Sequence, residues 1–176
     1  MYSRTKMQQP SLFKHIRDII ALPFTVTVIV PYFIHNPEKR FFTTNDILIQ
    51  SIGVLLASAG VSLFLYTVYL FKTFGSGTLA PWTATKKLVI RGPYKYCRNP
   101  MITGVLFILM GETLFLQSRN ILIWTITFFF INTIYFILKE EPDLEKRFGE
   151  PYKKYKAKVP RWIPSINPYD DVNTGS

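Results

Sequence analysis

Long uncharged apolar runs alternate with strongly charged stretches along this chain of 176 residues. Four of the runs are long enough, or nearly so, to cross a bilayer, whose hydrocarbon core of about 30 Å takes ~20 helical residues. Helices are the expected form because lipid cannot satisfy open backbone groups. The runs are Ile19 to Ile34, Ile47 to Phe71, Met101 to Gln117, and Ile121 to Leu138.

The connections between the runs complete the predicted architecture. Only Ser118, Arg119 and Asn120 separate the third run from the fourth, which predicts a tight antiparallel hairpin. The fourth helix is expected to end at the segment from Lys139 to Pro142. Beyond it, apolar residues recur at near-helical intervals, which predicts two short amphipathic helices lying on the lipid headgroups. These residues are Leu144, Phe148, Tyr152, Tyr155 and Val159.

The predicted fold class is therefore an all-α integral membrane protein. We expect a four-transmembrane-helix bundle with a long cytoplasmic loop and C-terminal amphipathic helices. Residues 1–164 are predicted to form a single domain, and residues 165–176 a flexible tail. The sequence leaves the oligomeric state open.

The basic residues give this bundle an orientation. The chain has 21 Lys and Arg against 11 Asp and Glu, for a net charge of +10. Eighteen of the 21 fall before the first run, between the second and third, or after the fourth. The positive-inside rule then predicts a multi-pass protein with both termini and the middle loop in the cytoplasm. Because these charges are spread along one membrane face, we expect anionic lipid rather than nucleic acid as their partner.

Composition narrows the possible chemistry. With 48% hydrophobic and 18% charged residues, the chain is neither a disordered protein nor an ordinary soluble domain. Cys97 is the single cysteine, which excludes an internal disulfide and a cysteine-built metal site. We expect no metal.

Small residues recur at helical spacing on the second and third runs. Gly53, Ala57 and Gly60 are four and three positions apart, and Gly104 and Gly111 are two turns apart. Small residues at such intervals let helix backbones approach closely, so packing is the expected role of this pattern.

The predicted cytoplasmic loop carries two motifs with possible chemistry. Gly75 and Gly77 expose backbone amides that could approach a cofactor closely, although a flexible exit from a helix would give the same pattern. Arg98 directly precedes Pro100 at the predicted start of the third helix. A helix N-terminus beside an arginine can hold a carboxylate, but Arg98 could equally be a membrane-interface anchor.

Carboxylates mark two further places. Glu112 lies inside the third run, where a charged group costs roughly 2.5–3.5 kcal/mol on insertion scales and is usually functional. Helical rise places it at a depth similar to that of Asn132, so the two could meet as a hydrogen-bonded pair or act in catalysis. Glu140 and Glu141 are adjacent at the exit of the fourth run and could bind a cationic ligand group or cap basic neighbours.

These motifs follow one another in an order that resembles the isoprenylcysteine carboxyl methyltransferase and phospholipid methyltransferase superfamily. The similarity extends from about Phe74 to Pro164. Its motifs are Gly75-x-Gly77; Gly92-Pro93-Tyr94-x-Tyr96-x-Arg98-Asn99-Pro100-Met101-x-x-Gly104; Glu140-Glu141-Pro142; and Phe148-Gly149-x-x-Tyr152-x-x-Tyr155-x-x-x-Val159-Pro160-Arg161-Trp162-Ile163-Pro164.

The resemblance implies an integral-membrane enzyme that transfers a methyl group from S-adenosylmethionine to a lipophilic acceptor. The acceptor could be an isoprenoid carboxylate, a phospholipid amine, or a small thiol or phenol. Asn99 stands where eukaryotic prenylcysteine enzymes have His, so the resemblance does not single out a prenylated protein. It implies a cofactor site formed by Gly75, Gly77, Tyr94, Tyr96, Arg98, Asn99, Pro100, Glu140 and Glu141. For chemistry at the acceptor we single out Glu112, Asn132 and Glu140.

Two other functions fit parts of the sequence. A membrane sterol-type reductase that binds a nicotinamide dinucleotide has a similar C-terminal pattern, but such proteins are usually longer. A non-catalytic membrane protein that keeps the same fold is the other alternative.

Overall fold

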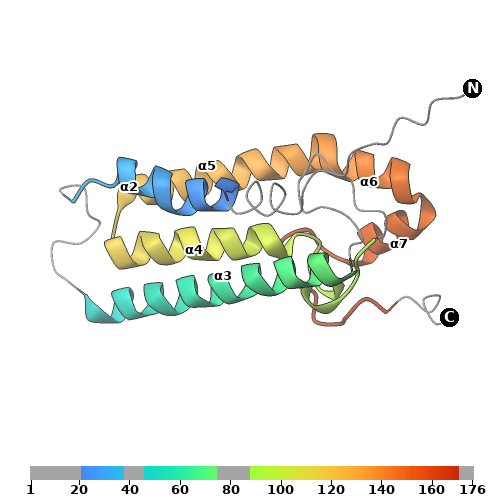
Figure 1. Cartoon of the computed structure of the whole chain (residues 1–176), viewed down its shortest axis with the longest axis horizontal. Helices are drawn as coiled ribbons and strands as arrows, with labels where there is room; N and C mark the ends of the chain where they lie inside the picture. Colours follow the sequence, from blue (N-terminus) through green and yellow to red (C-terminus); the bar gives the residue numbers. More distant parts are fainter. Residues whose placement is uncertain (1–20, 38–45, 75–87, 171–176) are drawn as a thin grey trace, which may run out of the picture.

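The computed structural model describes residues 21–37, 46–74 and 88–170, and these residues form helices and connecting segments without a strand. Figure 1 shows the helices lying roughly along one long axis. In chain order they are η1 (Thr25–Ile29), α2 (Val30–Ile34), α3 (Ile47–Phe74), η2 (Gly92–Lys95), α4 (Pro100–Leu116), α5 (Arg119–Tyr135), η3 (Phe136–Glu140), α6 (Glu141–Phe148) and α7 (Glu150–Lys158).

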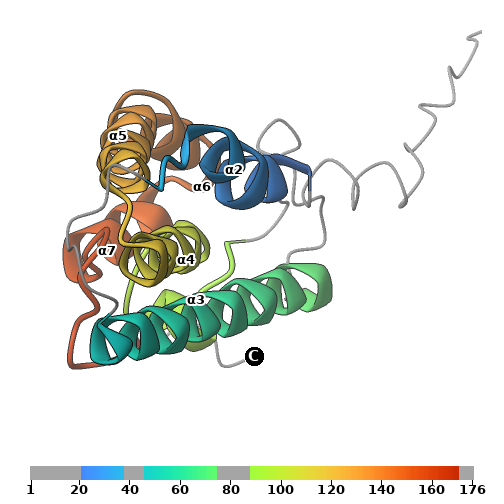
Figure 2. The ribbon, with the colours of Figure 1, turned by 90° about the vertical axis from the view of Figure 1, so that its left-hand side faces the viewer.

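Helix α4 lies at the centre of the bundle. It packs on α3 on one side and on α5 and η1 on the other (Figures 1 and 2). Its Val105 and Leu109 are buried together with Phe128 of α5. Val26, which precedes α2, and Phe64 of α3 pack against this cluster. All four helical segments therefore contribute to one apolar core.

Glycines bring α3 and α4 into backbone contact. A Cβ added at Gly60 would lie 2.6 Å from the carbonyl oxygen of Gly104, and one at Gly53 would lie 2.7 Å from that of Gly111. A Cβ at Gly111 would lie 2.6 Å from the backbone nitrogen of Ala57. The small-residue pattern is thus confirmed as an antiparallel packing interface.

This interface predicts a sharp response to one methyl group. We expect Gly60→Ala to destabilise the protein by about 1–3 kcal/mol, because the new Cβ meets backbone atoms that cannot rotate away. Unfolding in a detergent titration measures the change. Ala59→Leu, on the exposed side of the same helix, is the matched control and should be nearly neutral. Equal stability of the two variants would refute the tight interface.

The hairpin between α4 and α5 is shorter than expected. Gln117 takes a left-handed conformation with φ of 51°, and Ser118 caps α5 by accepting a hydrogen bond from the N–H of Ile121 (3.5 Å). Arg119, predicted in the loop, already begins the helix. A left-handed residue followed by a serine cap ends one helix and starts the next within two residues.

The fourth predicted helix does not end at Lys139. Helical structure continues without a break from Arg119 to Phe148. The π-helical turn η3 ends at Glu140, two residues before Pro142, and the π-helical turn η1 ends at Ile29, two residues before Pro31. Proline lacks an N–H and crowds the carbonyl four residues before it, so one wider turn lets each helix pass its proline.

Within the described residues, α3 and the helix from Arg119 to Phe148 are long and apolar enough to cross a membrane, while Ala21–Ile34 and Pro100–Leu116 are shorter apolar helices. Large apolar side chains are exposed along α3, including Ile47, Leu48 and Leu55. This pattern fits a helical membrane protein, because lipid and not water suits such a surface.

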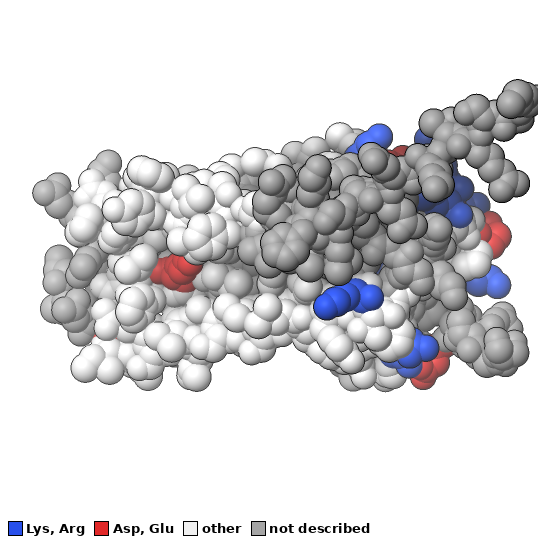
Figure 3. Space-filling view, in the orientation of Figure 1, with Lys and Arg blue, Asp and Glu red and all other residues white. Residues whose placement is uncertain are grey.

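Lys and Arg side chains gather toward one end of the bundle, where α6 and α7 lie (Figure 3). Of the Lys and Arg residues in the described ranges, Arg119 lies at the opposite end, at the start of α5. The others are Lys72, Arg91, Lys95, Arg98, Lys139, Lys146, Arg147, Lys153, Lys154, Lys156, Lys158 and Arg161. The charge asymmetry predicted from the sequence is therefore present in space. We call this the charged end.

The two short helices α6 and α7 form where amphipathic helices were expected, separated by Gly149 with φ of 60°. Their apolar faces are not turned to lipid, however. Tyr152, Tyr155 and Val159 are buried in a core with Tyr169, against which Leu144, Phe148, Leu88 and Ile90 pack. The expected position on the headgroups is corrected accordingly: these faces are occupied by other parts of the same chain.

Candidate functional site

Two segments distant in sequence lie side by side at the charged end. The N–H of Arg98 donates to the carbonyl oxygen of Pro160 (2.9 Å), and the N–H of Ser165 donates to that of Tyr96 (2.9 Å). The thiol of Cys97 donates to the carbonyl oxygen of Arg161 (3.1 Å). These bonds attach the C-terminal segment to the residues that lead into α4.

The expected flexible tail is therefore shortened at its start. The N–H of Tyr169 donates to the carbonyl oxygen of Lys95 (2.9 Å), and the Tyr169 side chain is buried. Residues 165–170 are part of the folded charged end, and residues 171–176 lie outside the described ranges.

Glu141 is the electrostatic centre of this region. Its carboxylate is buried, and Arg98 Nη1 lies 2.9 Å from Oε1. Arg161 Nε donates to the same oxygen (2.6 Å), and Lys156 Nζ lies 3.1 Å from Oε2. A buried carboxylate needs such partners. In this structure Arg98 and Glu141, both expected to contact a cofactor, pair with each other.

Glu140 has a different environment. It is half-buried, and none of the hydrogen bonds and ion pairs formed among the described residues involves its carboxylate. Successive helical residues point about 100° apart at 3.6 residues per turn, so Glu140 and Glu141 face different neighbours. Tyr94 and Tyr135 are close enough to sense the Glu140 charge. The adjacent carboxylates thus differ: Glu141 is fully paired, and Glu140 is available to a ligand.

The start of α4 lies close to Glu141, because Arg98, which pairs with Glu141, directly precedes it. Pro100 occupies its first turn and is fully buried, and the side chain of Asn99 does not cap the helix. Arg98 Nε is buried without a hydrogen-bond partner among the residues that the structure describes. Uncapped N–H groups and a buried guanidinium together form a place where an anionic group is favoured.

Tyrosines fill the space beneath this corner. The hydroxyl of Tyr155 donates to the carbonyl oxygen of Tyr94 (2.7 Å), and both residues are buried. Tyr155 also packs edge-on against Tyr169, with ring centroids 5.5 Å apart. This bond ties α7 to the turn η2, so it fixes the position of Arg98 indirectly. Tyr96, by contrast, is 37% exposed.

The buried tyrosines predict a loss of stability in alkali. Burial raises the pKa of the Tyr155 hydroxyl above its ordinary value near 10. The unfolded chain therefore loses this proton first, so stability is constant below about pH 10 and falls as pH rises further. We expect Tyr155→Phe to weaken that pH dependence and to cost about 1–2 kcal/mol at neutral pH, since Tyr94 loses its donor. Denaturant titrations at several pH values measure both effects. Tyr96→Phe, at the half-exposed position, is the control, and an unchanged pH dependence in Tyr155→Phe would refute the assignment.

The expected meeting of Glu112 and Asn132 does not occur. The side-chain amide of Asn132 donates to the carbonyl oxygen of Phe128 on its own helix (2.8 Å), and Glu112 Oε2 is buried without a partner among the described residues. Counted from the hairpin, Glu112 is about 7 Å and Asn132 about 21 Å along the axis at 1.5 Å per residue. Similar depth was expected because both helices were assumed to leave the membrane at the same level. The expectation is wrong, since the two residues lie at different distances from the hairpin that joins the helices. Catalytic roles for Glu112 and Asn132 stay predictions. Full turnover of Glu112→Gln at all pH values would exclude the role of Glu112.

Two of the predicted site residues lie outside the part of the chain that the structure describes, and two residues of the cluster were recognised only in the structure. Gly75 and Gly77 lie outside the described residues. Lys156 and Arg161, the partners of Glu141, were not singled out as site residues, although Arg161 stands within the Val-Pro-Arg-Trp motif.

Trp162, next to Arg161, packs against Phe129 and Phe136 with ring centroids 5.2 and 5.7 Å apart. It extends an apolar wall from the charged cluster onto the face of α5.

Comparison with known proteins identifies the family of the chain. The family described as phospholipid methyltransferase matches residues 48–151, more than half of the chain. The chain is 36% identical over 63 residues to an uncharacterized protein of Haemophilus influenzae, a match that covers all of that protein and 36% of this chain. No solved structure matches significantly. The matched range includes Arg98, the start of α4 and both glutamates. The resemblance inferred from the motifs is confirmed: the chain belongs to the phospholipid methyltransferase family, within the isoprenylcysteine carboxyl methyltransferase-like superfamily.

Proposed function

We propose that the protein transfers a methyl group from S-adenosylmethionine to a lipophilic acceptor at the charged end of the bundle. One group of residues supports this most directly. Arg98, which directly precedes α4, pairs with Glu141 within the matched family region, and the neighbouring Glu140 keeps a carboxylate without an ion pair among the described residues. The proposal includes four membrane spans with both termini and the charged end in the cytoplasm, as the positive-inside rule favours.

The residues present fit the two charged groups of the donor's amino-acid part. A free carboxylate at Glu140 suits its ammonium group, and the uncapped first turn of α4, which begins at Asn99 and Pro100, suits its carboxylate through the N–H groups that follow the proline. The orphaned Nε of Arg98 adds a second donor for that carboxylate. Tyr94 and Tyr96 would flank the site, and Gly75 and Gly77 remain part of the proposal. Glu141 would act as a positioning residue that holds Arg98.

The sulfonium of the donor supplies an activated methyl group for direct displacement. The task of the chain is then alignment, which can contribute about 7–11 kcal/mol to lowering a barrier. The charged side chains hold a polar ligand from the aqueous side. The wall of Trp162, Phe129 and Phe136 offers an apolar surface on which a hydrocarbon acceptor from the bilayer can lie.

Labelled-methyl transfer tests this proposal. The full chain in membranes is incubated with methyl-labelled S-adenosylmethionine and a total lipid extract of the host, and the labelled species are identified. We expect the label in a lipid. Its position on the headgroup or on a carboxyl group identifies the acceptor. Absence of transfer together with stabilisation by a nicotinamide dinucleotide, and none by S-adenosylmethionine, would favour the reductase alternative. Absence of any cofactor binding in calorimetry would favour a non-catalytic protein.

A further inference from the structure

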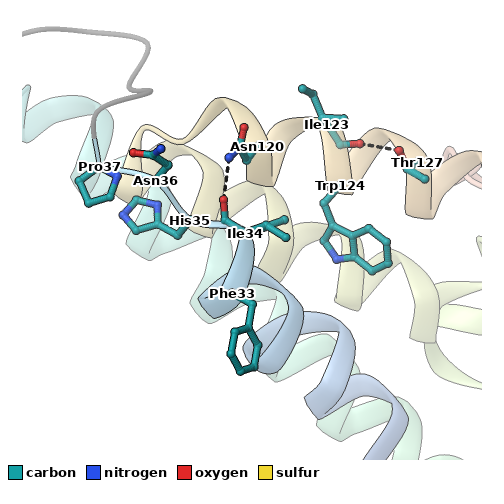
Figure 4. A pocket seen from close by; sticks show the side chains of 9 residues that line it. All are labelled: Phe33, Ile34, His35, Asn36, Pro37, Asn120, Ile123, Trp124 and Thr127. Carbon is teal, nitrogen blue, oxygen red and sulfur yellow. Dashed lines mark hydrogen bonds between the residues drawn. The ribbon is translucent and has the colours of Figure 1, made fainter.

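A pocket lies at the end of the bundle opposite the charged end. It has a volume of about 660 Å³ and is formed by the end of α2, the residues that follow it, and the first turns of α5 (Figure 4). Asn120, in its wall, is 20 residues before Glu140 along one continuous helix, a distance of about 30 Å at 1.5 Å per residue. That is the thickness of a bilayer core, so a ligand here would be in the other leaflet.

The pocket is held in shape by side-chain bonds between its two sides. Asn120 Nδ2 donates to the carbonyl oxygen of Ile34 at the end of α2 (2.7 Å). One turn along α5, Trp124 Nε1 donates to the carbonyl oxygen of Val26 (3.1 Å). Two attachments eight residues apart on the first segment fix its angle to α5. The space between them is therefore a built feature of the fold.

The lining combines a polar part with an apolar part. His35 Nδ1 is buried and has no hydrogen-bond partner within the described residues. Asn120 uses one amide N–H for Ile34, which leaves the second free of that bond. Phe33 and Ile123 flank the pocket and are 78% and 63% exposed. A ligand here would meet hydrogen-bond donors at its head and open apolar walls along its body.

We propose that this pocket binds a glycerophospholipid, with its phosphodiester at His35 and Asn120 and its acyl chains along Trp124, Ile123 and Phe33. A phosphodiester offers the acceptor oxygens that an imidazole N–H and an amide N–H both need. The exposed apolar walls distinguish a lipid from free phosphate, which has no use for them. The site is separate from methyl transfer, and Glu140 takes no part in it.

Quenching of Trp124 fluorescence by brominated lipid tests the proposal. Trp82→Phe and Trp162→Phe leave Trp124 as the only tryptophan. The full chain in detergent micelles is titrated with phosphatidylglycerol that carries bromine on its acyl chains. We expect saturable quenching that unbrominated phosphatidylglycerol relieves. His35→Ala should raise the half-saturating lipid concentration about tenfold, the equivalent of one lost charge-assisted hydrogen bond.

The controls decide between a site and general contact with lipid. Thr133→Ala removes a hydroxyl that bonds within α5 outside the pocket, and it should leave the titration unchanged, as should Glu140→Gln. Quenching that never saturates, or that is equal in His35→Ala and the parent, would overturn the proposal. Displacement by glycerol phosphate alone would show a free-anion site and overturn the lipid assignment. If the single-tryptophan protein fails to fold, native mass spectrometry of the unmodified chain and His35→Ala counts the retained lipid and applies the same criterion.

Discussion

Glu140→Gln is expected to abolish most binding of S-adenosylmethionine while leaving the fold intact. The Glu140 carboxylate has no ion pair among the described residues, so removing its charge leaves no cation stranded. Loss of a charge-assisted hydrogen bond to the donor's ammonium group should cost about 1.5–3 kcal/mol, or roughly ten- to hundredfold in Kd. Isothermal titration of the purified protein measures the affinity, and a thermal melt measures the fold.

Glu150→Gln is the matched control for this variant. Glu150 is exposed on α7 and pairs only with Lys153 in the described residues (2.9 Å), so the same change of charge should leave Kd within a factor of two. Wild-type affinity in Glu140→Gln would exclude the carboxylate from the cofactor site. A melting temperature that falls together with affinity would instead indicate a structural role for Glu140.

Much of the fold could be predicted from the apolar runs. The run from Ile47 and the run from Met101 form α3 and α4 with ends within three residues of those expected, because apolar length and glycine spacing are local properties of the chain. The end of the last helix could not be predicted. Pro142 normally limits a helix, and only the wide turn η3 shows how this one continues.

The motifs predicted which residues form the candidate site, but they did not predict which charged side chains pair with each other. The three cations around Glu141 come from positions before α4, on α7 and after α7. No spacing rule states which carboxylate of an adjacent pair they reach, because that depends on how α6 is rotated about its axis. The motifs identified Arg98 and the two glutamates as one cluster, and the structure divides their tasks.

Glu141→Gln should have the opposite effect to Glu140→Gln: a large loss of stability. Arg98 and Arg161 have side chains only 10% and 22% exposed, and both rely on the Glu141 carboxylate. Removing one partner of a buried ion pair typically costs about 3–5 kcal/mol, since the remaining charges are left uncompensated. For a chain of this size that corresponds to a fall in melting temperature of about 10 °C. A thermal melt in detergent measures it.

The control variant Glu145→Gln tests whether the loss of stability in Glu141→Gln comes from burial of the carboxylate or from the change of charge alone. Glu145 also contacts Lys156 (2.7 Å), but its side chain is 33% exposed and it holds neither arginine among the described contacts. An exposed pair of this kind contributes about 0–1 kcal/mol, so the control should melt close to the parent protein. If Glu141→Gln melts no lower than Glu145→Gln, then the cations around Glu141 are solvated and do not bind the C-terminal segment to α6. In that case Arg98 would be free to contact a ligand without Glu141, and the division of tasks between the two glutamates would be lost.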